Sequence, residues 1–153
     1  MKYIITLHSL TFLFIFITSC QDNKKSNLTL LSDQIPTDTP LIFGQGIIST
    51  DNHIEGSITF NPDMNELFFQ RRKPEDSHNI YTMKLIDGKW SNPELAFFST
   101  NKEYLDLHPR FSPNGDRLYF GSTRPLNDSI ISSGLHQWYI EKDENGWGNL
   151  FFY

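Results

Sequence analysis

The sequence predicts an all-β protein built from two similar units, each of four short antiparallel strands. Three observations support this prediction: an internal repeat, segments that alternate polar and apolar residues between turn signals, and a rich supply of aromatic side chains. Aromatic residues make up 14% of the 153 residues, and such side chains suit a pleated, half-buried surface. No window of the repeated region keeps the spacing of an amphipathic helix.

The repeat is clearest at a turn motif. The tetrapeptide FNPD at 60–63 recurs as FSPN at 111–114, an offset of 51 residues (111 minus 60). The same offset relates four further pairs: Glu55 and Asp106, Glu66 and Arg117, Leu67 and Leu118, Phe69 and Phe120. Later markers, such as Trp90 and Trp147, are 57 residues apart (147 minus 90), which places about six extra residues within 125–134. A period of about 50 residues with aromatic and glycine markers is typical of β-propeller blades.

The strands follow from the alternation and the turns. In the first unit we expect strands over 56–60, 67–70, 80–86 and 90–98, separated by turns at 61–65 and 87–88 and by a polar loop at 72–78. In the second unit the turn at 113–116 precedes a strand over 117–120, and a strand over 138–140 precedes the turn at 145–146.

The residue types in the turn at 113–116 suit the geometry of that turn. Proline fixes φ at the second turn position, and Gly115 is free to take the positive φ that the turn needs. We expect Phe111, Leu118 and Phe120 to pack between neighbouring blades, and Arg124 to pair with an acidic group or with loop carbonyls.

The first twenty residues have the pattern of an export signal. Lys2 is followed by a mostly apolar stretch over 4–17 and by small residues before Cys20, the only cysteine of the chain. The segment 17–20 (ITSC) resembles the lipobox of bacterial lipoproteins, in which the cysteine is lipidated and becomes the mature N-terminus. That resemblance predicts a signal peptide over 1–19, lipidation of Cys20 and attachment to an envelope membrane. The alternative is a free thiol beyond an ordinary signal peptide or within an N-terminal anchor helix.

Residues 20–40 are predicted to be the lipidated cysteine and a flexible tether, because their polar composition buries too little to fold alone. The first blade is assigned to 41–100, and a truncated second blade is assigned to 101–153. The net charge of −5 becomes −6 once Lys2 leaves with the signal, and this acidic balance argues against a nucleic-acid partner.

The stretch 106–125 (DLHPRFSPNGDRLYFGSTRP) resembles the WD-like β-propeller repeat of the TolB-like family, and the first unit resembles a degraded copy. Together with the lipobox, the chain is similar to envelope lipoproteins of the Bacteroidetes kind over about 46–153. The resemblance implies a propeller fold and an envelope setting, and it implies no substrate. Propellers close with about 4 to 8 blades. We therefore expect a truncated propeller of two blades, or else self-assembly, for example of three chains into one ring.

Candidate chemistry is sparse. The histidines show no zinc spacing; they stand at positions 8, 53, 78, 108 and 136. Glu55 and Asp106 are the best pair of carboxylates for glycoside hydrolysis, yet their equivalence in the repeat favours a structural role. No G-x-S-x-G elbow is present, and 44–46 is a lone G-x-G without a helix after it. We predict no catalytic, cofactor-binding or metal-binding residues and no cofactor.

Two classes of function follow. The first is an envelope-anchored binding or scaffolding module that uses the loops at one face for an envelope protein, peptide or glycan. The second is the propeller part of an enzyme, a sialidase-like glycoside hydrolase or a peptidase, whose catalytic residues lie outside this sequence. The first is preferred because no residue here requires catalysis.

Overall fold

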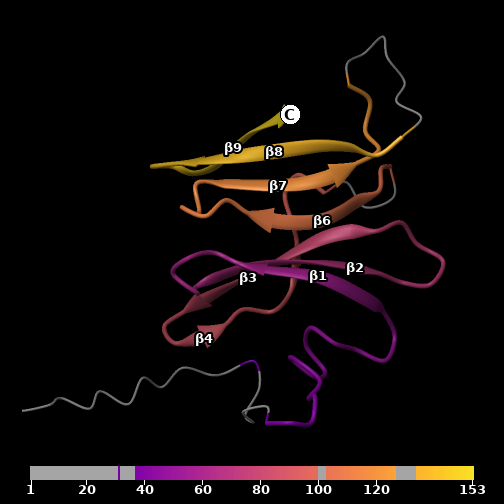
Figure 1. Cartoon of the computed structure of the whole chain (residues 1–153), viewed down its shortest axis with the longest axis vertical. Coiled ribbons are helices and arrows are strands. Elements are labelled where there is room, and N and C mark those ends of the chain that lie inside the picture. The colour runs from indigo at the N-terminus through magenta and orange to yellow at the C-terminus, as the bar shows by residue number, and fades with distance from the viewer. Residues whose placement is uncertain (1–30, 32–36, 100–102, 127–133) are drawn as a thin grey trace, which may run out of the picture.

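The computed structural model describes residues 31, 37–99, 103–126 and 134–153. Within these residues the protein is all-β, without a helix, and its strands form two antiparallel sheets (Figure 1). The all-β prediction is confirmed. Cys20, the predicted signal over 1–19 and most of the predicted tether over 20–40 lie outside the described residues.

The first sheet contains three long strands and two short ones. β1 (Ile54–Phe60), β2 (Glu66–Arg72) and β3 (Asn79–Ile86) pair in this order, and both β4 (Lys89–Trp90) and β5 (Glu94–Leu95) pair with β3. The prediction of one continuous fourth strand over 90–98 was therefore wrong. Pro93 stands between the two short strands and has no N–H for a ladder hydrogen bond. Nearby, the Ser91 hydroxyl accepts the hydrogen bond of the Lys84 N–H in place of a backbone carbonyl.

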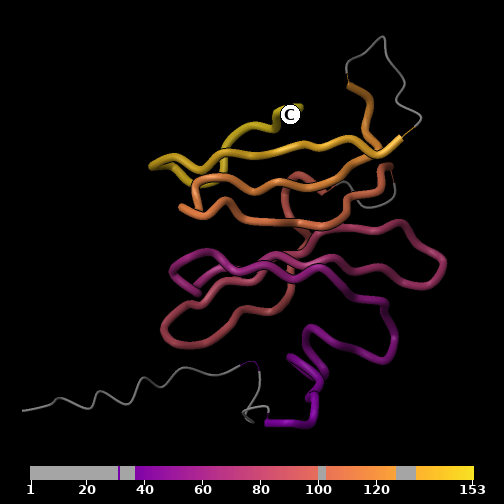
Figure 2. Tube along the Cα trace, viewed as in Figure 1, coloured from indigo at the N-terminus to yellow at the C-terminus, as the bar shows by residue number. Residues whose placement is uncertain are grey.

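The second sheet has the predicted four strands. They are β6 (Asp106–Phe111), β7 (Arg117–Ser122), β8 (His136–Asp143) and β9 (Gly146–Phe152), paired in chain order. β6 is the strand of this sheet that lies beside β1, β2 and β3, and Figure 2 shows the two sheets stacked one on the other.

The repeat extends to the backbone conformation. Ser57 and His108, which are equivalent at the 51-residue offset, both have positive φ (48° and 54°), and each lies at a β-bulge in the first strand of its sheet. Met64 and Gly115 are also equivalent and also have positive φ (55° and 77°). The expectation for Gly115 is confirmed. Met64 adopts the same conformation although it has a Cβ, which makes a positive φ energetically unfavourable.

Each sheet has two faces that repeat in the same sense. We call the face of Leu67, Phe69 and Arg71 the rear face of the first sheet and the face of Glu66, Phe68 and Gln70 its forward face, because side chains alternate along β2. In the second sheet the equivalent rear face carries Leu118, Phe120 and Ser122, and the equivalent forward face carries Arg117, Tyr119 and Gly121.

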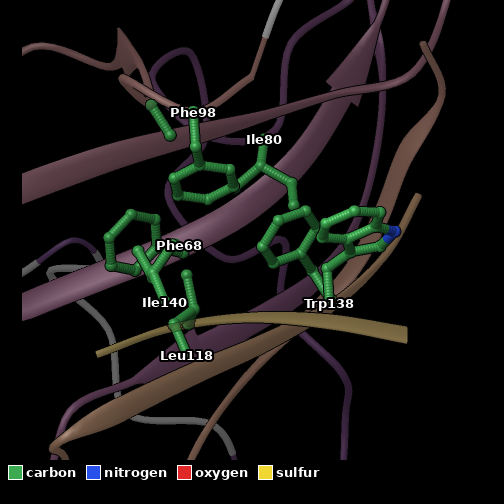
Figure 3. Packing of buried hydrophobic residues seen from close by; sticks show 8 residues of the cluster. Phe68, Ile80, Phe98, Leu118, Trp138 and Ile140 are labelled. Atoms are coloured by element: carbon green, nitrogen blue, oxygen red, sulfur yellow. The ribbon is translucent and has the colours of Figure 1, made fainter. Parts of the chain in front are cut away.

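The main core lies where the forward face of the first sheet meets the rear face of the second. Figure 3 shows Phe68, Ile80 and Phe98 on one side of this cluster and Leu118, Trp138 and Ile140 on the other. The rings of Phe98 and Phe120 stack with centroids 4.6 Å apart. The predicted packing of Phe111, Leu118 and Phe120 between the two units is confirmed, with Phe111 partly buried.

A second cluster covers the rear face of the first sheet. Ile48 packs there on Leu67, Phe69 and Met83, and Leu31 contacts the same cluster from within the predicted tether. The backbone around Ile48 is held by a compact turn, in which the N–H groups of 47, 48 and 49 all donate to the Gly44 carbonyl. The segment 43–49 therefore covers the rear face of the first sheet, as the first sheet covers the rear face of the second.

The two equivalent turns allow a paired stability test. A Cβ at Gly115 would lie 2.6 Å from Cδ of Pro62 in the first sheet and would also have to adopt a positive φ. We expect Gly115→Ala to lower the free energy of unfolding by about 1–3 kcal/mol. Met64→Gly relieves the strained φ of an exposed side chain, and we expect it to raise the free energy of unfolding by up to about 1 kcal/mol. Urea denaturation of both variants measures this, and equal effects of the same sign would contradict the assignment of the turns.

Candidate functional site

A buried ion pair anchors the second sheet. Nη2 of Arg124 lies 2.8 Å from the carboxylate of Asp106, whose side chain is fully buried, and also donates to the Phe98 carbonyl. Nε of Arg124 donates to the Ser122 hydroxyl, and the Ser99 hydroxyl donates to the second carboxylate oxygen of Asp106. The expectation that Arg124 pairs with an acidic group or with loop carbonyls is confirmed on both counts.

The first sheet repeats this arrangement with different residues. Nε of Arg71 lies 3.3 Å from the Glu55 carboxylate, close enough for an ion pair but without hydrogen-bond geometry. Nη2 of Arg71 donates to the carbonyls of Ile47 and Ile48. Ile47 and Phe98 are 51 residues apart, so each arginine binds the equivalent carbonyl of the segment before its own sheet.

The arginines also lie over equivalent aromatic rings. Arg71 is 4.9 Å from the ring centroid of Phe69 and 5.4 Å from that of Tyr81. Arg124 lies at 5.3 Å and 5.5 Å from the equivalent rings, Phe120 and Trp138. Cation–π attraction therefore adds to each ion pair. The two carboxylates that were the best candidates for paired acid–base chemistry are each held by a separate arginine, one in each sheet.

A polar network joins the two sheets at the end where these arginines lie. The His108 N–H donates to Oε1 of Gln70, which leaves Nε2 of Gln70 to donate to Nδ1 of His78 at 2.7 Å. Since Nδ1 accepts this bond, neutral His78 carries its proton on Nε2. The His78 carbonyl in turn accepts from the Asp106 N–H. Burial, followed by the charges of Arg72 and His108, lowers the pKa of His78 below its ordinary value of 6.5.

The loops beside this network form a polar pocket, which we call the loop-end pocket. Its volume is about 260 Å³, and its lining consists of His53, Arg71, Arg72, Lys73, Asp76, Ser77, Asn79 and Tyr81. Nη1 of Arg72 donates to the carbonyls of Lys73 and Pro74, which stabilises the loop between β2 and β3. Nδ1 of His53 lies 2.9 Å from the Thr50 hydroxyl. The pocket thus combines cationic side chains and the carboxylate of Asp76 with hydroxyl and amide groups.

The four histidines that the structure describes each have a different partner. His53 is bonded to Thr50, His78 to Gln70 and His108 to Ser57, while His136 packs its ring against Phe152. Within the part of the chain that the structure describes, no three His, Cys, Asp or Glu side chains are grouped so that they could hold a metal ion.

A second buried carboxylate lies at the opposite end and was not singled out from the sequence. Glu66 of β2 accepts hydrogen bonds from Nζ of Lys142 and Nε1 of Trp147, both at 3.0 Å, and its side chain is only 5% exposed. These contacts cross from the first sheet to the second beside a cleft of about 270 Å³. The repeat equates Glu66 with Arg117, and this equivalence gives no signal for the partners Lys142 and Trp147.

Neither a protein-family model nor a curated protein nor a solved structure matches the chain. A search of the described residues for helices long and apolar enough to cross a membrane found none.

The buried pair predicts an asymmetric response to mutation. Arg124→Ala leaves the Asp106 carboxylate buried without its counter-charge, and we expect a loss of about 3–5 kcal/mol in the free energy of unfolding. The double variant Asp106→Asn/Arg124→Met removes both charges and should lose less than the sum of the two single variants. Lys89→Ala, at an exposed cation of β4, serves as the control and should leave the melting temperature nearly unchanged. Additive effects in the double variant would contradict the pairing.

The His78 contact predicts a pH dependence. Because the folded-state pKa of His78 is lowered, the folded protein resists the proton that the unfolded chain takes up as the pH falls through 6.5. We expect the free energy of unfolding to decrease between about pH 7.5 and 5.5, and His78→Gln to reduce that decrease. Urea denaturation across this range and an NMR titration of His78 measure both effects. A His78 pKa at or above 6.5 would contradict the assignment.

Proposed function

We propose that the chain is an envelope-anchored lipoprotein whose two sheets are TolB-like propeller blades and which acts as a binding or scaffolding module. The observation that supports this most is the repeated arginine cluster. Each sheet combines an acid, an arginine, carbonyl groups of the preceding segment and two aromatic rings, which gives these buried residues a role in the framework. What is left for a partner is the polar surface of the loops.

The loop-end pocket is the contact site in this proposal. Its lining offers Lys73, Arg72 and His53 for a carboxylate and Tyr81 and Ser77 for hydroxyl groups. A carboxylate-bearing envelope protein or glycan has the chemistry to bind there. The rigid sheets supply a support, and the predicted lipid on Cys20 keeps the pocket at a membrane surface.

Site-specific photo-crosslinking tests this function. A photoreactive residue in place of Lys73 should trap an envelope partner when the full-length chain is expressed in its native cells. The same residue in place of Lys89, an exposed lysine at the opposite end of the first sheet, should not trap that partner. Mass spectrometry of the adduct distinguishes a protein from a glycan.

Cys20→Ser provides the control for the anchor. We expect it to abolish labelling of the chain with a fatty acid, to release the chain from the membrane fraction and to reduce the Lys73 adduct. Equal adducts at positions 73 and 89 would count against the loop-end pocket as the contact site. Unchanged fatty-acid labelling of the Cys20→Ser chain would count against the lipid anchor.

A further inference from the structure

Among the described residues, no other sheet covers the forward face of the second sheet, although the equivalent face of the first sheet is buried. On the first sheet, Phe68 is 2% exposed and lies beneath the second sheet. Its equivalent Tyr119 lies on a face with three other aromatic side chains, Tyr139, Phe151 and Tyr153, of which Phe151 is 39% and Tyr153 69% exposed. The forward face of the second sheet therefore carries the residue types of an interface, and no layer of the described chain covers it.

The open face is ordered by contacts among its own side chains. Tyr139 stacks on Phe151 at 5.2 Å, Tyr119 lies 5.8 Å from Tyr139, and Tyr153 meets Tyr119 edge to face at 5.7 Å. Beside this row, Arg117 forms a 2.8 Å ion pair with Glu141 on the neighbouring strand. A preordered aromatic face loses little side-chain entropy when a partner covers it.

We propose that this face binds a second copy of the chain, sheet against sheet, about a twofold axis. Arg117 lies directly across from Glu141 in the sheet, and Tyr119 directly across from Tyr139. An axis parallel to the strands and midway between β7 and β8 therefore sets each Arg117 opposite the partner's Glu141 and each Tyr119 opposite the partner's Tyr139. The face is complementary to itself, which is what a twofold interface requires.

The shape of the face agrees with the same axis. Beside Tyr119 lies a hollow of about 440 Å³ over β6, β7 and β8, lined among others by His108, Gly121 and Gln137. Tyr153 follows β9, on the other side of the axis, and its N–H donates to the Gln137 carbonyl at the level of the hollow. The twofold rotation carries the exposed Tyr153 ring of one copy towards the hollow of the other.

At the other end of the described fold, the rear face of the first sheet is already occupied. The rear face of the first sheet is covered by Ile48, which is 4% exposed, and the guanidinium of Arg71 holds the carbonyls of Ile47 and Ile48 over it. A copy that packed there would have to displace this segment. Pairing of two forward faces leaves every contact of the described fold in place.

Charge complementation between co-expressed chains tests the proposal. Full-length chains with two different tags are expressed together, and the fraction of one that copurifies with the other is measured. Arg117→Glu leaves two acidic residues at these positions, and Glu141→Arg leaves two basic residues. Like charges then face each other across the axis, and the copurified fraction of each single variant with itself should fall at least about ten-fold. Mixing the two variants puts opposite charges across the axis, and we expect copurification to return.

Two further measurements complete the test. The double variant Arg117→Glu/Glu141→Arg restores the ion pair within one chain and should associate with itself, and thermal melting establishes that each single variant folds. Tyr153→Ala should weaken the association of the otherwise unchanged chain. A monomeric unmodified chain, a folded single variant that still associates with itself, or a mixture that does not recover would overturn the proposal. Copurification of an unrelated protein without a second copy would overturn it as well.

Discussion

The structure depends on the buried ion pair between Arg124 and Asp106. Asp106 is fully buried, and without Arg124 its carboxylate would have no counter-charge in the interior. The same arginine reaches back to the Phe98 carbonyl, so the ion pair fixes the position of the segment before the sheet as well as the sheet itself. Since Phe98 is a central residue of the main core, electrostatics and packing specify one arrangement together.

Most of the fold could be predicted from the sequence because the repeat and the turns are local signals. The strands on both sides of the turn at 61–65 and the strand after the turn at 113–116 occur where the alternation placed them, and the positive φ of Gly115 follows from the residue type. The fourth strand of the first sheet was less predictable, because Pro93 and the Ser91 hydroxyl bond redirect a segment whose composition suits a strand. Pro93 and Ser91 both act on the hydrogen bonding of this segment with β3, and that pairing is not visible in the local sequence pattern.

The candidate site was predictable only in part. The equivalence of Glu55 and Asp106 indicated a role repeated in each unit, and each carboxylate is indeed bound by an arginine. The role of Gln70 as a bridge between His78 and His108 had no sequence signal, because it arises from the distance between two sheets. Which residues of the β2–β3 loop line a pocket likewise depends on the path of that loop and on the segment around His53 that passes beside it.

The charges at one pair of equivalent positions have a consequence for how the chain folds. Repeated units can pair in the wrong order, because their strands and cores resemble one another. Glu66 of the first sheet receives Lys142 and Trp147 of the second, while the equivalent position of the second sheet holds Arg117. Were the two sheets to exchange places, Arg117 would face Leu85 and Trp90, the equivalents of Lys142 and Trp147, and the facing positions would offer it no counter-charge. The opposite charges of Glu66 and Arg117 at equivalent positions therefore favour the observed order of the two similar sheets over the exchanged order.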